Sequence, residues 1–161
     1  MEKILFEEKQ YFRQWWLFIM LLPIVGIFVY GLIKQIFFDI PFGNNPMSDL
    51  GLIISSILII IICLMMFFIG LETRITNYGI YIKFFPFNSN FKFFPWDDIA
   101  SHEVIKYKPI RDYGGWGIRG SGKNKAYNVS GNYGLMLKFY NGNKLLIGTN
   151  KPDELKNQLK N

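Results

Sequence analysis

Two long apolar runs without a charged side chain constrain this chain more than any other feature. They cover residues 15–33 and 50–71. Each has about the 20 residues that cross a hydrocarbon core of roughly 30 Å as a helix rising ~1.5 Å per residue. The sequence therefore predicts a membrane α-helical hairpin, with two transmembrane helices, over residues 15–71.

The alternative for the first run is a cleaved signal peptide. Signal peptides begin with a short basic segment and end at a cleavage site of small residues. Here the preceding segment contains Glu2, Glu7 and Glu8, no such cleavage site follows, and a second apolar run comes next. These features favour a membrane span.

The connection between the two runs is short and rich in residues that break helices. Residues 39–49 contain two prolines, a glycine and two asparagines, which predicts a tight external turn and an antiparallel pair of helices. Ser48 or Asp49 is placed to cap the second helix.

The distribution of basic residues predicts the orientation in the membrane. The chain carries a net charge of +6, and basic residues close to membrane spans remain in the cytoplasm. Lys34 is the one basic residue between the runs, whereas five flank them on the other side: Lys3, Lys9, Arg13, Arg74 and Lys83. We therefore expect a multi-pass protein of a bacterial inner (cytoplasmic) membrane with both termini cytoplasmic.

The segment before the first run, residues 1–14, is short and mixed in character. Ile4, Leu5, Tyr11, Phe12 and Trp15 fall on one face if the segment is helical. A helix with one apolar face can lie along a membrane surface. The pattern predicts an interfacial N-terminal segment that leads into the first span.

From residue 72 the pattern changes to short runs rich in Ile, Tyr, Phe and Val, separated by Gly, Asn and Pro. Asn141 and Gly142 are a strong signal for a hairpin turn. A C-terminal helix is predicted over 152–160, with Leu155 and Leu159 on its buried face. The predicted strands are 73–77, 80–85, 91–96, 102–108, 116–119, 135–140 and 144–149.

Strands followed by one helix resemble a pleckstrin-homology-like (PH-like) domain, a small antiparallel β-barrel or sandwich capped by a C-terminal helix. The chain also resembles a family of small bacterial two-span membrane proteins that carry such a domain. The resemblance implies a cytoplasmic PH-like domain over residues 72–161 and provides no catalytic residue. The segments that carry it are 71–75 (LETRI), 79–81 (GIY), 96–99 (WDDI), 113–119 (YGGWGIR), 127–131 (YNVSG) and 146–149 (LIGT).

A glycine-rich segment beside basic and aromatic residues is the candidate binding site. It contains a GxGxxG match at 115–120 and a near match to a phosphate-binding loop at 117–124, but no helical pattern follows either one, as nucleotide binding requires. Cations beside aromatic side chains could instead contact anionic headgroups or a partner, and the alternative is a solvated basic loop on the cytoplasmic side. The candidate residues are Arg111, Tyr113, Trp116, Arg119, Lys123, Lys125 and Tyr127.

The sequence contains no recognisable catalytic or metal-binding constellation. Cys63 is the single cysteine and lies in the second apolar run, and His102 is the single histidine. We therefore expect no enzyme activity, no metal, no cofactor and no nucleic-acid partner. The favoured function is a membrane-anchored binding module or scaffold that recruits or regulates a protein partner, or another copy of itself, or binds anionic headgroups. The alternatives are protection of the envelope, or immunity, against membrane-active peptides and an enzyme with a membrane-proximal substrate.

Overall fold

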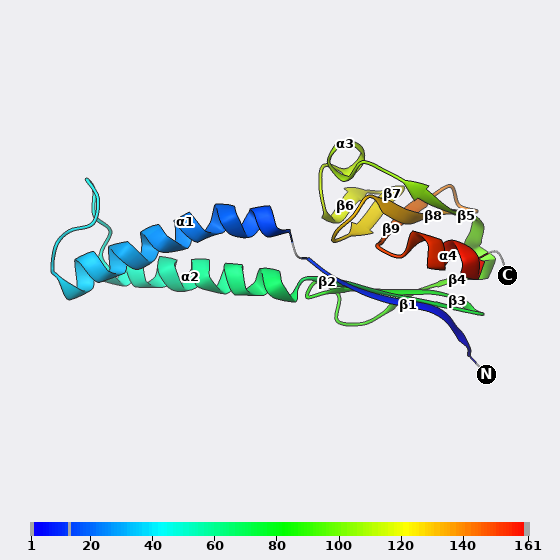
Figure 1. The fold of residues 1–161 in the computed structure, drawn as a ribbon, viewed down its shortest axis with the longest axis horizontal. Coiled ribbons are helices and arrows are strands. Elements are labelled where there is room, and N and C mark those ends of the chain that lie inside the picture. The colour runs from blue at the N-terminus through cyan, green and yellow to red at the C-terminus, as the bar shows by residue number, and fades with distance from the viewer. Residues whose placement is uncertain (1, 13, 160–161) are drawn as a thin grey trace. The chain divides into compact units, whose positions relative to one another are not determined.

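The computed structural model describes residues 2–12 and 14–159, which form two compact units. One unit contains residues 14–67 and is helical. The other contains residues 2–12 and 68–159 and is built mainly from strands (Figure 1). The helical unit is thus an insertion between the first and second strands of the β unit.

The helical unit is a hairpin of two apolar helices. Helix α1 (Trp15–Leu32) continues into the π-helical turn η1 (Ile33–Phe37), and α2 (Asp49–Phe68) returns antiparallel to it. Phe18 near the start of α1 stacks on Phe67 near the end of α2, with ring centroids 4.7 Å apart. By length and composition alone, both helices are able to cross a membrane.

The turn between these helices is held by polar contacts. Gln35 Nε2 donates hydrogen bonds to the Met47 carbonyl oxygen and to the Asp49 carboxylate, at 2.8 and 2.7 Å. Ser48 Oγ accepts the backbone N–H of Gly51 at 3.2 Å. The predicted cap of the second helix is confirmed, and Ser48 provides it.

The strands of the β unit form two sheets. Sheet A has the order β1–β2–β3–β4 and is antiparallel, with strands β1 (Ile4–Tyr11), β2 (Gly70–Thr76), β3 (Gly79–Phe85) and β4 (Lys92–Pro95). Sheet B has the order β5–β8–β9–β7–β6, with β5 (Ile99–Lys106), β6 (Gly117–Ser121), β7 (Asn124–Asn128), β8 (Tyr133–Phe139) and β9 (Lys144–Thr149). Three short helical elements complete the unit, namely η2 (Trp96–Asp98), α3 (Pro109–Tyr113) and α4 (Pro152–Leu159).

The helical prediction for the N-terminal segment is wrong, because residues 4–11 form strand β1. This strand pairs antiparallel with β2 over a register from Ile4↔Thr76 to Tyr11↔Gly70. Its inward side chains are Phe6, Glu8 and Gln10, all buried. Two of these three are polar, so the strand lacks the apolar alternation by which a half-buried strand is recognised. The β unit therefore requires residues 2–12 as well as those that follow α2.

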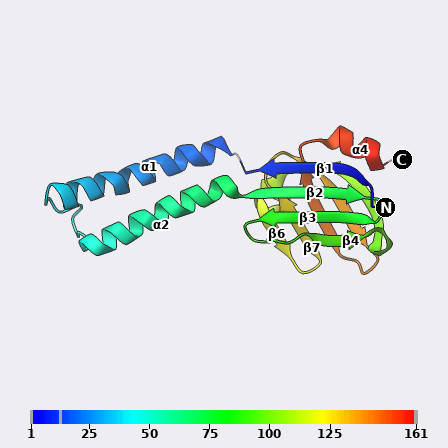
Figure 2. The ribbon, with the colours of Figure 1, turned by 90° about the horizontal axis from the view of Figure 1, so that it is seen from below.

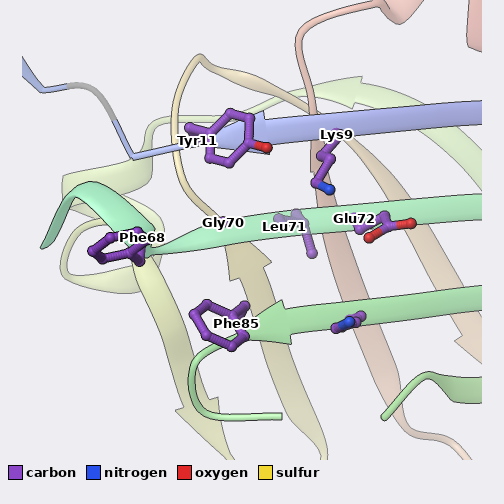
Figure 3. Close-up of a pocket in the computed structure, with 8 residues that line it drawn as sticks. Lys9, Tyr11, Phe68, Gly70, Leu71, Glu72 and Phe85 are labelled. Atoms are coloured by element: carbon purple, nitrogen blue, oxygen red, sulfur yellow. The ribbon is translucent and has the colours of Figure 1, made fainter. Parts of the chain in front are cut away.

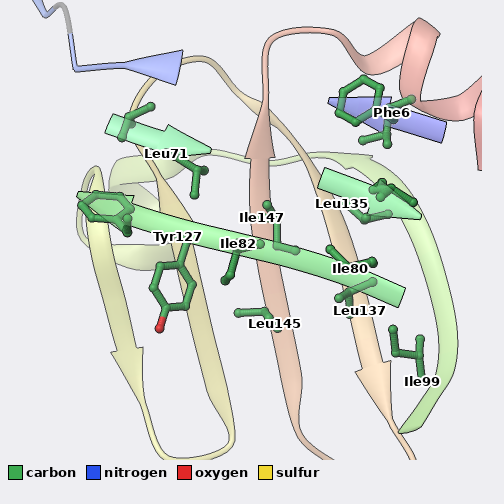
Figure 4. Close-up of a cluster of buried hydrophobic side chains, with 14 residues drawn as sticks. Phe6, Leu71, Ile80, Ile82, Ile99, Tyr127, Leu135, Leu137, Leu145 and Ile147 are labelled. Carbon is green, nitrogen blue, oxygen red and sulfur yellow. The ribbon is translucent and has the colours of Figure 1, made fainter. Parts of the chain in front are cut away.

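The core lies between the two sheets. Leu71, Ile80 and Ile82 of sheet A face Leu135, Leu137 and Ile147 of sheet B, and each is at most 1% exposed. Strand β3 crosses over the strands of sheet B at this contact (Figure 4). Burial of one such side chain contributes about 1.5–3 kcal/mol, so this apolar layer is the main source of stability.

Helix α4 covers one open side of this two-layered unit. It lies beside β1 of sheet A (Figure 2) and also packs against β5 of sheet B, and its Leu155 is 2% exposed within the core. The predicted C-terminal helix and the burial of Leu155 are confirmed. Leu159 is partly buried against the same core.

The sequence predicted either a β-barrel or a β-sandwich, and a closed barrel does not form. Within the described residues, the two sheets remain separate and do not close on each other. Sheet B is also not purely antiparallel, since β7 runs parallel to β9. The edges of β1 and β5 are separated by α4, which explains why hydrogen bonding does not continue from one sheet to the other.

Candidate functional site

The glycine-rich segment that was expected to be a binding loop is mostly regular structure. Residues 109–113 form α3, and residues 117–128 form the β6–β7 hairpin with a turn at Gly122 and Lys123. Gly120 and Gly122 adopt φ angles of +76° and +59°, which L side chains rarely adopt, so the glycines serve the hairpin geometry.

Tyr113 is partly buried and serves mainly in packing, although it also lines a hollow with Lys125. Its ring contacts Tyr107 edge to face, with centroids 5.8 Å apart. It packs on a small buried cluster of Tyr107, Ala126 and Leu146 on the outer face of sheet B. Burial raises the pKa of both tyrosine hydroxyls, so both remain neutral.

Arg111 is already paired within its own helix. Its guanidinium lies 2.9 Å from the carboxylate of Asp112, in an exposed ion pair. The same carboxylate accepts the backbone N–H of Lys108 at 2.8 Å, and this bond, followed by Arg111, lowers the pKa of Asp112. Arg111 is therefore part of a local cap of α3.

Arg119 and Trp116 also make local contacts. Arg119 Nε donates to the Trp116 carbonyl oxygen at 2.8 Å, and Trp116 Nε1 lies 3.4 Å from the Gly131 carbonyl oxygen. Arg119 pairs with Ala126, whose side chain belongs to the outer cluster of sheet B. Because neighbouring residues of a strand point to opposite faces, Arg119 faces away from Tyr127. The seven predicted residues thus do not form one site, and Lys123 lies exposed in the hairpin turn.

Lys125 and Tyr127 line a cleft between the two sheets. Strand β4 of sheet A forms one wall of the cleft and strand β7 of sheet B forms the other. The cleft has a volume of about 370 Å³. Its apolar part is formed by Phe94, Phe139 and Leu145, and the two phenylalanine rings are 5.7 Å apart. Its polar part comes from Lys92, Asp98, Gly122, Lys125, Tyr127, Asn141, Asn143 and Lys144.

The central polar contact joins the two sheets. Lys92 Nζ on β4 donates a hydrogen bond to the hydroxyl of Tyr127 on β7 at 3.0 Å. An ammonium group has only donors, so the hydroxyl must accept this bond. The proton of the Tyr127 hydroxyl can then be donated to an acceptor in the cleft. The pair thus presents an ammonium and a hydroxyl donor close together.

The charge balance of the cleft favours an anion. Lys92, Lys125 and Lys144 carry three positive charges against the one carboxylate of Asp98. None of these three lysines belongs to an ion pair among the residues that the structure describes. Lysine side chains bind phosphates and carboxylates as point charges, so the cleft suits an anionic group attached to an apolar one.

Nothing in the described residues suggests that this cleft holds a metal. No cluster of three or more His, Cys, Asp or Glu side chains occurs in residues 2–12 and 14–159. His102, on β5, instead contacts the ring of Trp96, with centroids 5.3 Å apart. The arrangement is suited to binding by charge and apolar contact.

Sequence reasoning identified Lys125 and Tyr127 but missed Lys92, Lys144 and the aromatic floor. Strand β7 itself was missed, because residues 124–128 show no alternation of apolar and polar side chains. On β4, Lys92 and Phe94 point to one face of the sheet and Phe93 points to the other. If Phe93 is taken as the outward residue, Lys92 must point inward, and this is the signal that could have identified it.

Comparisons of the chain with models of protein families, with curated proteins and with solved structures find no match. Its function is therefore inferred from its own helices and cleft.

Proposed function

We propose that this chain is a membrane-anchored binding module of a bacterial cytoplasmic membrane, with a PH-like β unit on the cytoplasmic side. Its inter-sheet cleft binds an acidic segment of a protein partner that also presents an apolar side chain. The cleft, with Lys92 and Tyr127 joined across it, is the observation that carries this proposal. The two-sheet architecture with a packed C-terminal helix agrees with the PH-like resemblance of the sequence.

Membrane anchoring is supported by the exposure of the two long helices. Only 6% and 11% of the residues in their most apolar 18-residue stretches are buried within the protein. Leu22, Leu50, Leu58 and Phe67 are each more than half exposed. Apolar surface in water costs about 25 cal/mol per Å², so a lipid environment stabilises these helices.

The topology proposal predicts that the turn between the helices is accessible from outside the cell. We expect an Asn44→Cys variant, in a Cys63→Ala background, to react with a membrane-impermeant maleimide on intact cells. Asn44 is exposed in the structure, so the thiol is reachable. The matched control is Asn157→Cys on α4, which should react only after lysis. The reverse labelling pattern would refute the proposed orientation.

An acidic protein segment is favoured because the cleft combines cations with an apolar floor. The open side between β4 and β7 is not covered by α4, which packs against β1 and β5, an edge strand of each sheet. A peptide with a carboxylate beside an apolar side chain could satisfy Lys125 and Tyr127 while contacting Phe94 and Phe139. Each exposed ion pair in such a contact contributes about 0.2–1 kcal/mol.

The test uses the full chain in its native membrane. We would replace Asn143, at the rim of the cleft, with a benzoylphenylalanine photo-crosslinker. We expect one protein to be crosslinked from this position and not from Asn157 on α4. Replacing Lys92 and Lys125 with Glu should weaken the capture by roughly 2- to 30-fold, if the two contacts together contribute about 0.4–2 kcal/mol.

A matched charge reversal controls for net charge. Lys106 and Lys156 are exposed and lie outside the cleft, so their double replacement with Glu should leave the crosslink unchanged. Equal loss of capture in both double variants would mean that only overall charge matters. Capture from Asn157 in place of Asn143 would place the partner elsewhere on the β unit.

A further inference from the structure

A second hollow lies on the outer face of sheet A, at the end where strands β1 and β2 meet the helical insertion. It has a volume of about 220 Å³ and shares no lining residue with the inter-sheet cleft. Figure 3 shows Tyr11 and Phe85 on either side of Gly70, with Lys9 and Glu72 one step further along the strands. The remaining lining residues are Phe68, Leu71 and Lys83.

The hollow lies at the end of sheet A where the chain leaves the β unit for α1 and re-enters it after α2. Tyr11 on β1 pairs with Gly70 on β2. The next residues toward the helices, Phe12 and Ile69, are also joined, because the Phe12 N–H donates to the Ile69 carbonyl oxygen at 2.9 Å. Phe68, which lines the hollow, is also the last residue of α2. Three residues separate β1 from α1, and a residue extends at most about 3.6 Å. If the helices span a membrane, as proposed above, this end of sheet A lies at the lipid headgroups.

The charges around the hollow leave two lysines uncompensated. Lys9, Glu72 and Lys83 lie opposite one another on three neighbouring strands. Glu72 is held by Arg74, whose guanidinium lies 2.6 Å from it and 2.8 Å from Glu7. Lys83 also lies over the ring of Phe91, 5.6 Å from its centroid. Neither Lys9 nor Lys83 forms an ion pair within residues 2–12 and 14–159.

The aromatic walls of the hollow are exposed, and its floor depends on a glycine. Tyr11 and Phe85 are 42% and 44% exposed. A Cβ atom on Gly70 would lie 3.0 Å from the Gln10 carbonyl oxygen and 3.5 Å from the Tyr11 ring. A larger residue would therefore fill the space between the rings. Tyrosine, an amphipathic aromatic, prefers the headgroup level of a bilayer, and Phe85 adds apolar surface, so these walls suit lipid.

We propose that this hollow binds the headgroup of an anionic phospholipid of the cytoplasmic leaflet. The ammonium groups of Lys9 and Lys83 contact the lipid phosphate, while the Glu72 carboxylate on the strand between them stays paired with Arg74. The glycerol portion lies against Tyr11 and Phe85, above Gly70. The site rests on the proposed membrane insertion of the helices and is separate from the cleft that receives the protein partner. It ties the β unit to the bilayer at the place where the chain leaves it.

The test measures lipid binding to the purified full chain in a mild detergent by native mass spectrometry. Phosphatidylglycerol, phosphatidylcholine and water-soluble glycerol 3-phosphate are titrated separately. We expect phosphatidylglycerol to bind more tightly than either of the others. Replacing Lys9 and Lys83 with Gln should weaken its binding roughly 30-fold, because two cations at ~1 kcal/mol each convert at 1.4 kcal/mol per tenfold.

Two matched variants distinguish this site from general electrostatics. Replacing Lys9 and Lys83 with Arg retains the charge and should preserve binding. Replacing Lys138 and Lys156 with Gln removes the same charge elsewhere and should leave binding within about twofold of wild type, since surface charges more than about 8 Å away are largely screened at physiological ionic strength.

The outcomes separate the two proposals. A chain that does not insert into phosphatidylglycerol vesicles, assayed by flotation, would refute membrane anchoring itself. An inserted chain that binds both phospholipids equally, or is unaffected by the Gln variants, would overturn the lipid site alone. Glycerol 3-phosphate binding as tight as that of phosphatidylglycerol would identify a soluble phosphate ligand instead, and would equally overturn the lipid proposal.

Discussion

A chain that begins at Ile69 and lacks strand β1 should fail to fold. The reason is that β1 supplies part of the core and several buried hydrogen bonds. Phe6 is 3% exposed within the core cluster. The buried carboxylate of Glu8 accepts the Thr149 hydroxyl at 2.6 Å and the Asn150 N–H at 2.9 Å. Gln10 Nε2 donates to the Gly148 carbonyl oxygen at 2.7 Å.

The free energy that β1 contributes is large enough to account for the loss of folding. Burial of Phe6 contributes about 1.5–3 kcal/mol, and each hydrogen bond to the Glu8 carboxylate contributes about 1.5–3 kcal/mol. Together these contributions are comparable with the entire stability of a typical domain, about 5–15 kcal/mol. Loss of β1 would also expose the inner side chains of β2, among them Leu71 and Ile75, which are fully buried.

The close approach of Phe12 and Ile69 suggests how folding of the β unit without the helices can be restored. Phe12 and Ile69 are hydrogen-bonded to each other, so the 14–67 insertion leaves and re-enters the β unit at adjacent points. Residues 2–12 joined to 69–161 through a glycine-containing turn of about four residues should therefore form a soluble domain. Circular dichroism with urea should show a cooperative transition for the rejoined chain and none for 69–161. A cooperative transition of equal midpoint in both would show that β1 is dispensable.

Leu155→Ala in the full chain should cost about 2–5 kcal/mol of unfolding free energy for the β unit. Leu155 is 2% exposed and is the one residue of α4 in the buried core cluster. Its removal leaves a cavity where the helix spans the edges of β1 and β5. Some of the effect comes from the lost burial of the side chain and the rest from the cavity, because close-packed neighbours relax only in part.

The control for this prediction lies on the same helix. Asn157 is exposed, so Asn157→Ala should change the stability by less than about 0.5 kcal/mol. Leu159 is half-buried, so Leu159→Ala should lie between the two. Urea unfolding of the detergent-solubilised chain measures all three. A cost for Leu155→Ala well below 1 kcal/mol would show that α4 rests on the unit without completing its core.

Elements with a strong local signal were predicted correctly. The apolar runs at 15–33 and 50–71 became the helices Trp15–Leu32 and Asp49–Phe68, except that Gly70 and Leu71 begin strand β2. Asn141 and Gly142 mark the turn between β8 and β9, and the C-terminal helix begins at Pro152 as expected. In each case the deciding interaction involves residues a few positions apart, so the pattern can be detected in a short window.

Elements that depend on distant partners were missed. Strand β1 contains Glu8 and Gln10 at inward positions, and polar residues there are stable only because residues 148–150, near the other end of the chain, supply their hydrogen bonds. Strand β7 pairs in parallel with β9. Strand β8 lies between them in the sequence and pairs with the other edge of β9, so this contact forms only when the β8–β9 hairpin is in place. No local pattern encodes either requirement.

The candidate site shows the same division. The sequence identified basic and aromatic residues between positions 111 and 127, but strand alternation sends Arg119 to the outer face of sheet B and Tyr127 to the inner one. Lys92 reaches Tyr127 from the other sheet. Composition alone thus predicted a basic surface and not which cations share a cleft.

The amino-acid sequence was sufficient to specify two apolar helices, a strand-rich unit and the capping helix, because hydrophobic periodicity and turn residues act over a few positions. The tertiary structure alone decided that the helices interrupt a β hairpin, that the sheets stay open and that α4 separates two of their edges. It also decided that Lys92 meets Tyr127 and that Lys9 and Lys83 flank one hollow. These arrangements depend on pairing between strands that are far apart in the chain, and such pairing is selected by the burial of the whole core rather than by any local preference.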